Sequence, residues 1–132
     1  MNKKFSIIER IISFKYALKG LKLLIKEEHN AWIHLFFMLL AMVFGIAYSI
    51  SLNEWIILIL LFALVFLCEL FNSAIENLCN YIQPEKQAII GKIKDLSAAA
   101  VLVTAIAAFI IGLIIFFAKK LTAGTTSPSP AR

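Results

Sequence analysis

Residues Trp55 to Leu70 read WIILILLFALVFLCEL and continue into FNSAIENLCNYI, so an apolar run leads directly into a polar one. At helical spacing, one face of this helix gathers polar side chains: Glu69, Asn72, Ser73, Glu76 and Asn80. A charge at bilayer depth costs about 2.5–3.5 kcal/mol on insertion scales, so a carboxylate there is a candidate functional group by default. The stretch therefore predicts a membrane helix that carries a site.

The whole chain has the composition of an integral membrane protein. Of its 132 residues, 61% are hydrophobic, and the mean hydropathy is +0.89. Apolar runs at 33–50, 55–70 and 98–117 are each long enough, with their flanks, to cross a hydrocarbon core of about 30 Å. We predict an all-α membrane protein with a single domain at 1–121, in which an N-terminal amphipathic surface helix precedes three transmembrane helices.

The predicted boundaries follow from charged residues, aromatic residues and helix breakers. They are 1–27 for the surface helix, 28–51, 54–81 and 85–120 for the transmembrane helices, and 122–132 for a disordered tail. Gln83-Pro84-Glu85 predicts a helix stop and restart. Trp32 and Trp55 stand where interfacial aromatic residues belong, at opposite membrane faces.

The distribution of basic residues predicts the orientation in the membrane. The formal net charge is +5, and Lys and Arg recur before the first apolar run, whereas the turn at 51–54 has none. The loop at 82–97 carries further lysines. By the positive-inside rule the N-terminus and this loop face the cytoplasm, although Lys119 and Lys120 argue weakly for the opposite orientation. A nucleic-acid partner is not expected, because the charges flank membrane spans.

Counting along the helices places several polar residues at one depth. At 1.5 Å per residue, Glu69 lies about 21 Å inward from Trp55, and Glu76 lies about 32 Å inward. Counted from the outer ends of their own helices, Glu28 and Asp95 each lie about 33 Å inward. The residues expected at the inner headgroup level are Glu28, Glu76, Lys94 and Asp95. Glu69 is expected one to two turns deeper.

This arrangement suits phosphoryl transfer to a lipid hydroxyl. Glu28 and Glu76 can share Mg²⁺, which takes one or two carboxylates together with substrate phosphates. Lys94 can neutralise phosphate charge, and the partly desolvated Glu69 suits a general base. Taken alone, Lys94 could be a headgroup anchor and Asp95 could cap the third span. The alternative function is a small oligomeric proton-coupled transporter that uses Glu69, although a transporter prefers a site near the midplane.

The sequences ELFNSAIENLCNYI at 69–82 and GKIKDLSAAAVL at 91–102 resemble the prokaryotic diacylglycerol kinase family, which comprises small trimeric lipid kinases of the membrane. The specific signature is ExxNSAIE followed by KD, and the resemblance extends over nearly all of residues 5–117. HNAWIHL at 29–35 and NEW at 53–55 resemble the undecaprenol-kinase branch more than the diacylglycerol branch.

The resemblance implies a homotrimeric, ATP- and Mg²⁺-dependent kinase of the bacterial cytoplasmic (inner) membrane. Its acceptor would be a membrane lipid alcohol, with undecaprenol the first choice and diacylglycerol the second. Glu69 would deprotonate the lipid hydroxyl, and Asn72 would orient the Glu69 region. Glu28 and Glu76 would bind the metal of ATP. The residues implied to hold ATP are Arg10, Tyr16, Glu28, Glu76, Glu85, Lys86, Gln87, Lys94 and Asp95. Two departures alter a polar contact and a lipid contact: Asn80 replaces the Asp of many members, and Ala98 replaces a Ser.

Overall fold

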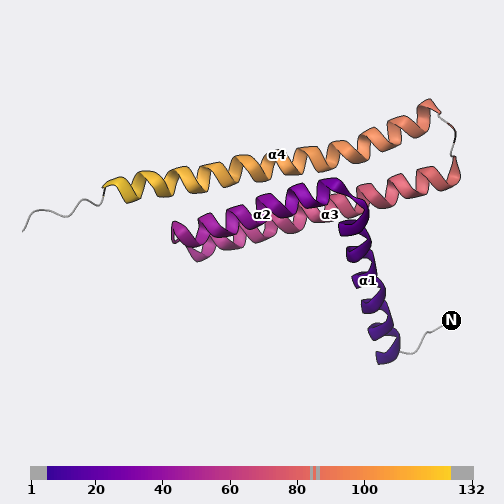
Figure 1. Cartoon of the computed structure of the whole chain (residues 1–132), viewed down its shortest axis with the longest axis horizontal. Helices are drawn as coiled ribbons and strands as arrows, with labels where there is room; N and C mark the ends of the chain where they lie inside the picture. The colour runs from indigo at the N-terminus through magenta and orange to yellow at the C-terminus, as the bar shows by residue number, and fades with distance from the viewer. Residues whose placement is uncertain (1–5, 84, 86, 126–132) are drawn as a thin grey trace, which may run out of the picture.

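The computed structural model describes residues 6–83, 85 and 87–125, and these form helices without any strand. The helices are α1 (Ile7–Glu27), α2 (His29–Ala47), α3 (Leu52–Ile82) and α4 (Ala88–Thr125). α2, α3 and α4 run side by side along one axis, and α1 leads away from them at a steep angle (Figure 1). The predicted all-α class is therefore confirmed for the described residues. Pro84 of the predicted helix stop, Lys86 and the ends of the chain, 1–5 and 126–132, lie outside them.

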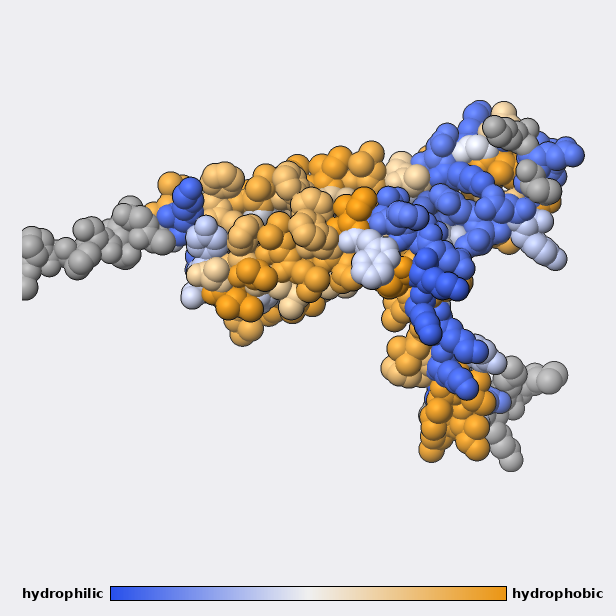
Figure 2. Space-filling model, viewed as in Figure 1, coloured by the Kyte–Doolittle hydropathy of each residue, from blue (hydrophilic) through white to orange (hydrophobic). Residues whose placement is uncertain are grey.

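The three helices of the bundle are long and apolar enough to cross a membrane. The candidate spans are His29–Ala47, Leu52–Ile82 and Ala88–Thr122. Apolar surface covers the middle of the bundle, while hydrophilic surface gathers at the end where α3 leads into α4 (Figure 2). An apolar surface of this extent is unfavourable in water and is compatible with lipid tails. The chain is a multi-pass membrane protein.

The N-terminal helix ends at Glu27, as the sequence predicts, and begins at Ile7 rather than at residue 1. Ser6 is its N-cap, and the Ser6 hydroxyl accepts a hydrogen bond from the backbone N–H of Glu9 at 3.4 Å. Most side chains of α1 are exposed, but Leu24 near its end is buried where α1 meets α2 and α3. α1 ends at Glu27, and Glu28 then turns the chain into α2 with an extended backbone.

The last helix differs from its predicted bounds at both ends. α4 begins at Ala88 rather than at 85, so Glu85 and Gln87 precede it. Asp95 therefore lies inside the helix and cannot be its N-cap. At the other end, the helix continues to Thr125, so residues 122–125 are helical and do not belong to a disordered tail. No proline interrupts these residues, since the first proline of the tail is Pro128, so the backbone N–H donors that a helix needs are all present there.

α2 ends at Ala47, four residues before the predicted boundary, in a Schellman motif. The backbone N–H of Ile50 donates to the carbonyl of Gly45 at 3.1 Å, and that of Ser49 donates to Ile46 at 3.1 Å. Ser49 has a φ of 48°, the left-handed conformation that glycine usually supplies. These bonds satisfy the last carbonyls of α2 and turn the chain toward α3.

A capping box begins α3 at the same end of the bundle. The Ser51 hydroxyl accepts from the N–H of Glu54 at 3.4 Å, and Glu54 Oε2 accepts from the N–H of Ser51 at 2.6 Å. Lys119 of α4 places its Nζ 3.5 Å from the same carboxylate oxygen. The start of α3 thus meets the end of α4, as antiparallel neighbours require.

The hydrophobic core lies near this turn, away from the polar end of the bundle. Ile50, Leu58 and Ile115 are buried together. Trp55 packs against them and is only partly exposed, so it is a core residue as well as a candidate for the membrane interface. Because this core fixes α3 against α4, the polar residues farther along both helices are held in a defined register.

Candidate active site

α3 buries a carboxylate on the face that packs against α4. Its buried residues recur at helical spacing: Leu58, Val65, Glu69, Asn72 and Cys79. The side chain of Glu69 is 1% exposed, and neither of its carboxylate oxygens has a hydrogen-bond partner among the described residues. Burying such a group without a partner is costly, so its retention points to a function.

Two further acids lie near Glu69. Glu28 and Glu76 are both close enough to Glu69 to interact with it electrostatically. Glu28 comes from the α1–α2 junction, where its N–H donates to the carbonyl of Leu24 at 2.9 Å. Glu76 lies two turns along α3 from Glu69. The structure thus brings together three carboxylates that the sequence analysis selected from two separate segments.

Glu28 and Glu76 have the chemistry of a magnesium site. Both side chains are half-buried, and both offer hard oxygen ligands. Within residues 6–83, 85 and 87–125 no group of three or more His, Cys, Asp or Glu side chains is arranged to hold a metal. Mg²⁺ needs no such cage, because it keeps several waters and binds through one or two carboxylates plus substrate phosphates. The pair therefore fits a metal that arrives with a phosphate ligand.

Asn72 connects the acids on α3 to α4. Its Nδ2 donates to Glu76 Oε1 at 3.4 Å, and its Oδ1 accepts from Ser97 Oγ at 2.7 Å. The resemblance implies that Asn72 orients the Glu69 region, but its amide contacts Glu76 and not Glu69 itself. Ser97, 9% exposed, was missed by the sequence analysis. The available signal was a hydroxyl three residues after Lys94 and four before Val101, on one face of α4.

Lys94 and Asn80 form a second polar contact between α3 and α4. Lys94 Nζ donates to Asn80 Oδ1 at 2.6 Å. Among the described residues, Lys94 forms no ion pair with a carboxylate, since the ion pair found there joins Glu54 and Lys119. Its charge is thus held by a neutral amide and remains available to a phosphate. An altered polar contact is expected at Asn80, where many members of the resembled family carry Asp. The partner of Asn80 in this contact is Lys94.

Other predicted nucleotide-binding residues do not meet the carboxylates within one chain. Arg10 and Tyr16 are exposed on α1, which leads away from the bundle (Figure 1), and the Tyr16 ring lies under Lys19 Nζ at 5.5 Å from its centroid. Asp95 is exposed on α4, although it follows Lys94 directly. Glu85 and Gln87 are also exposed, in the connection between α3 and α4. The site within a single chain is therefore acidic and only partly assembled.

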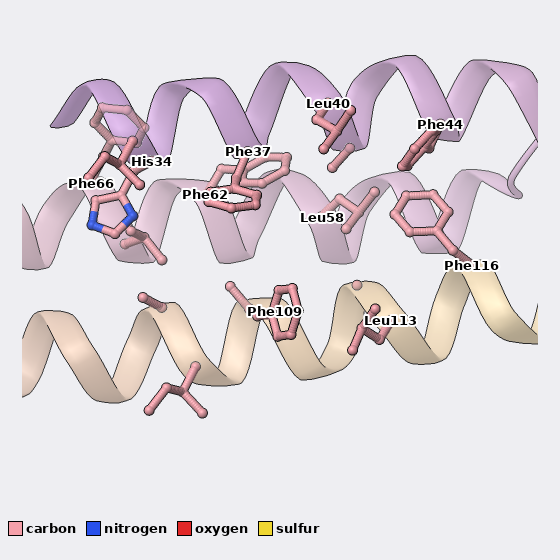
Figure 3. A pocket seen from close by; sticks show the side chains of 17 residues that line it. His34, Phe37, Leu40, Phe44, Leu58, Phe62, Phe66, Phe109, Leu113 and Phe116 are labelled. Carbon is pink, nitrogen blue, oxygen red and sulfur yellow. The ribbon is translucent and has the colours of Figure 1, made fainter. Parts of the chain in front are cut away.

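An apolar groove of about 450 Å³ runs between α2, α3 and α4 (Figure 3). Aliphatic and phenylalanine side chains make up most of its lining, with Phe37, Phe62 and Phe109 in the middle. Among the described residues that line it, His34 is the polar one. On α3 the groove includes Val65, one turn before Glu69. The groove therefore lies along the same face of α3 as the buried carboxylate.

The sequence profile of the prokaryotic diacylglycerol kinase family matches residues 15–116, which extend from α1 to near the end of α4. The undecaprenol kinase of Bacillus subtilis (strain 168) is 34% identical to this chain over 107 residues. That alignment covers 81% of this chain and 87% of the relative.

Both similarities are to kinases that act on lipids, so the transporter alternative is not favoured. The matched region contains Glu28, Glu69, Glu76 and Lys94 together with the first two spans and most of the third. The chain is a lipid kinase and belongs to the prokaryotic diacylglycerol kinase family.

Proposed function

We propose that this enzyme transfers the γ-phosphoryl group of ATP to the hydroxyl of undecaprenol, with Mg²⁺, at the cytoplasmic face of the bacterial inner membrane. The observation that carries the proposal is the carboxylate of Glu69, which is buried, has no hydrogen-bond partner among the described residues, and lies near two further acids and one turn from an apolar groove. The named activity of the Bacillus subtilis relative supports the choice of acceptor. Diacylglycerol is the second choice.

Glu69 is the general base of the proposed reaction. Its free oxygens accept the proton of the lipid hydroxyl while the lipid oxygen forms a bond to the γ-phosphorus. The bond between that phosphorus and the bridging oxygen of ADP breaks, so the products are the lipid phosphate and ADP. Burial in a protein–lipid environment keeps bulk water away from Glu69, which favours transfer to the lipid over hydrolysis of ATP.

Glu28 and Glu76 are proposed to hold the magnesium ion. When bound, Mg²⁺ supplies positive charge that neutralises the phosphates during transfer. The two half-buried carboxylates provide the oxygen ligands, and Lys94 adds a fixed positive charge on the α4 side. Asn72 holds the carboxylate of Glu76 in place through its amide.

The groove is proposed to hold the hydrocarbon chain of the acceptor. Its lining is almost entirely hydrophobic, so it offers dispersion contacts but few hydrogen-bond donors (Figure 3). A prenol needs no donors along its chain, whereas a diacylglycerol has ester carbonyls that must be left unpaired or satisfied elsewhere. A chain that lies in the groove would present its hydroxyl end toward Glu69, because Val65 of the groove is one turn away.

We further propose a homotrimer whose nucleotide sites combine two subunits. Arg10 and Tyr16 are exposed on α1 and lie apart from the acids of their own chain (Figure 1). Since α1 leads away from the bundle, it is positioned to bring these side chains to a neighbouring subunit. Glu85, Lys86, Gln87 and Asp95 are proposed to complete the nucleotide contacts.

Lipid-dependent ATP consumption tests this function directly. Purified protein in mixed micelles would be supplied with ATP, Mg²⁺ and one of a panel of lipid alcohols that includes undecaprenol and diacylglycerol. We expect a lipid phosphate as product and no turnover without a lipid acceptor. A chain that binds ATP but phosphorylates none of these lipids would contradict the proposal.

A further inference from the structure

Ser97 differs from Thr104, a second hydroxyl side chain of α4, in its hydrogen bonds. Thr104 directs its hydroxyl to the backbone carbonyls of Ala100 and Val101, at 3.0 Å and 2.9 Å, within its own helix. Serine and threonine within helices commonly bond in this way. Ser97 has the same option, since Lys94 O lies 2.9 Å from its Oγ, but the hydroxyl also lies 2.7 Å from Asn72 Oδ1 on α3. It therefore joins two helices where Thr104 bonds to one.

The contact is buried at both ends. Ser97 is 9% exposed and Asn72 is 6% exposed, so water is a poor substitute for either partner. A hydroxyl has a single hydrogen to donate, and donation to Oδ1 fixes the carbonyl side of the amide toward α4. The NH₂ group then faces α3, where it donates to Glu76 Oε1 at 3.4 Å. The Asn72 side chain is thus held from both sides.

The opposite orientation of the amide is unfavourable next to Glu76. It would bring the carbonyl oxygen of Asn72 against a carboxylate oxygen, and two acceptors repel each other. If the Ser97 hydroxyl is removed and the Asn72 amide keeps its orientation, the carbonyl of Asn72 becomes a buried acceptor that has lost its Ser97 donor. The Asn72 side chain can then lower its free energy by rotating away from Glu76 to find another donor for its carbonyl. The position of the Glu76 carboxylate therefore depends on the hydroxyl of Ser97 on another helix.

We propose that Ser97 is a positioning residue of the kinase, which orients the Asn72 amide and through it the carboxylate of Glu76. Ser97 itself contacts Asn72 and the backbone of Lys94 and none of the three acids. Its effect on catalysis therefore passes through Asn72. The inference rests on the proposed function for its catalytic consequence, but the orientation of the amide does not depend on which lipid is phosphorylated.

The kinetic test compares Ser97→Ala with Thr104→Ala, which removes a hydroxyl from the same helix without a cross-helix partner. For Ser97→Ala we expect kcat to fall about 3- to 10-fold, which corresponds to one neutral hydrogen bond, and the half-saturating Mg²⁺ concentration to rise. Thr104→Ala should change neither value. Ser97→Thr keeps a hydroxyl and should restore both values to near wild type.

A double-variant comparison separates positioning from general packing. In an Asn72→Ala background the Ser97 hydroxyl can still donate to Lys94 O, so Ser97→Ala should cause no further loss of rate. Full additivity of the two losses would overturn the proposal. A lower thermal midpoint for Ser97→Ala with an unchanged Mg²⁺ dependence would also overturn it, because that pattern indicates a role in packing alone.

A spectroscopic measurement tests the hydrogen bond without any turnover. With ¹⁵N-asparagine labelling in micelles, the side-chain amide of Asn72 is identified by its loss in Asn72→Ala. We expect Ser97→Ala to shift this resonance and to speed its hydrogen exchange, while Thr104→Ala leaves it unchanged. An unchanged resonance in Ser97→Ala overturns the inference even if the enzyme is an active kinase. If the wild type is inactive on every lipid, the proposed function fails, and this measurement still decides the role of Ser97.

If Ser97→Ala does not fold, Ser97→Cys provides the second variant. A thiol fills the space that Ser97→Ala leaves empty, although it is larger than the hydroxyl, and it is a weak donor. We expect Ser97→Cys to lie between wild type and Asn72→Ala in kcat, and to shift the Asn72 resonance. Wild-type kinetics with an unshifted resonance would overturn the proposal.

Discussion

Gly45 of α2 lies so close to Trp55 of α3 that a Cβ added at Gly45 would be 2.6 Å from Cη2 of the indole and 3.1 Å from Cδ1 of Ile50. A contact of 2.6 Å is not tolerated without movement of the indole or of a helix. The carbonyl of Gly45 also accepts the hydrogen bond that closes α2. The missing side chain thus sets how closely α2 and α3 approach at the turn.

We expect Gly45→Ala to destabilise the protein despite the higher helix propensity of alanine. Overpacking of this kind typically destabilises a protein by about 1–3 kcal/mol. The higher helix propensity of alanine stabilises a helix by roughly 1 kcal/mol, so we expect the overpacking to exceed it. The matched control is Gly20→Ala in α1, where an added Cβ would meet no atom within 4 Å. Thermal unfolding in detergent should give a lower midpoint for Gly45→Ala than for Gly20→Ala. Equal midpoints would show that Trp55 moves freely.

Ser49→Gly should stabilise the same turn. Ser49 adopts a φ of 48°, and a left-handed conformation costs a residue with a Cβ roughly 1–2 kcal/mol. Glycine avoids this cost but loses more conformational entropy on folding, so we expect a net gain of about 0.5–1 kcal/mol. The measurement is the free energy of unfolding in a mixed-micelle titration. A loss of stability would indicate that the Ser49 side chain makes a contact that outweighs the strain.

The polar face of α3 could be predicted because it depends only on local geometry. Glu69, Asn72 and Glu76 recur at helical spacing, and a continuous apolar helix leaves little freedom in where they point. The shared depth of Glu28 and Glu76 also follows from a fixed rise per residue. These predictions needed helix geometry and a membrane thickness, and no knowledge of packing.

The role of Ser97 and the groove could not be predicted in the same way. Ser97 precedes three alanines, and that pattern is equally typical of close helix packing. Its contact with Asn72 depends on the rotation of α4 about its own axis, which is set by core residues such as Leu58 and Ile115. The direction of α1, and with it the position of Arg10, depends on contacts between elements and has no local sequence signal.

Glu69→Gln should abolish phosphoryl transfer and leave the fold intact. Loss of a general base typically lowers the rate about 10²–10⁴-fold, while the amide keeps the volume of the side chain. The neutral amide also escapes the repulsion of Glu28 and Glu76, so we expect a thermal midpoint equal to or above that of wild type. Turnover, nucleotide binding and thermal unfolding would be measured on one preparation. Turnover near the wild-type rate would refute the assignment of Glu69 as the base.

Glu28→Ala and Glu76→Ala should each weaken Mg²⁺-dependent binding of ATP. If both carboxylates bind one ion, removal of either disrupts the same site, and the double variant should lose less than the sum of the two single losses. Titrations of Mg²⁺ at fixed ATP would give the half-saturating concentration for each variant. Ser73→Ala is a control on the same helix face, since its side chain is half-buried and not a proposed ligand. Strictly additive losses would argue for two separate roles.

The acceptor preference depends on the chemistry of the groove. Among the described residues that line it, His34 is the polar one, so ester carbonyls of a diacylglycerol that entered it would lack donors. Each buried carbonyl left unpaired costs about 1–3 kcal/mol, or roughly 5- to 150-fold in discrimination. We therefore expect a higher kcat/KM for undecaprenol than for diacylglycerol when both are presented in the same mixed micelles. Equal or better use of diacylglycerol would refute the lipid preference without affecting the kinase assignment.

A variant that fills the groove tests whether the prenyl chain lies there. Gly112 lines the groove, and a Cβ added at this position would meet no atom within 4 Å, so the side chain of Gly112→Leu starts in open space and occupies part of the groove. We expect it to lower kcat/KM for undecaprenol several-fold more than for a short prenol, because a short chain occupies less of the groove. Gly20→Leu on α1 controls for the change in helix propensity and should affect both prenols equally. If Gly112→Leu lowered kcat/KM by the same factor for both chain lengths, the prenyl chain would not extend as far along the groove as Gly112.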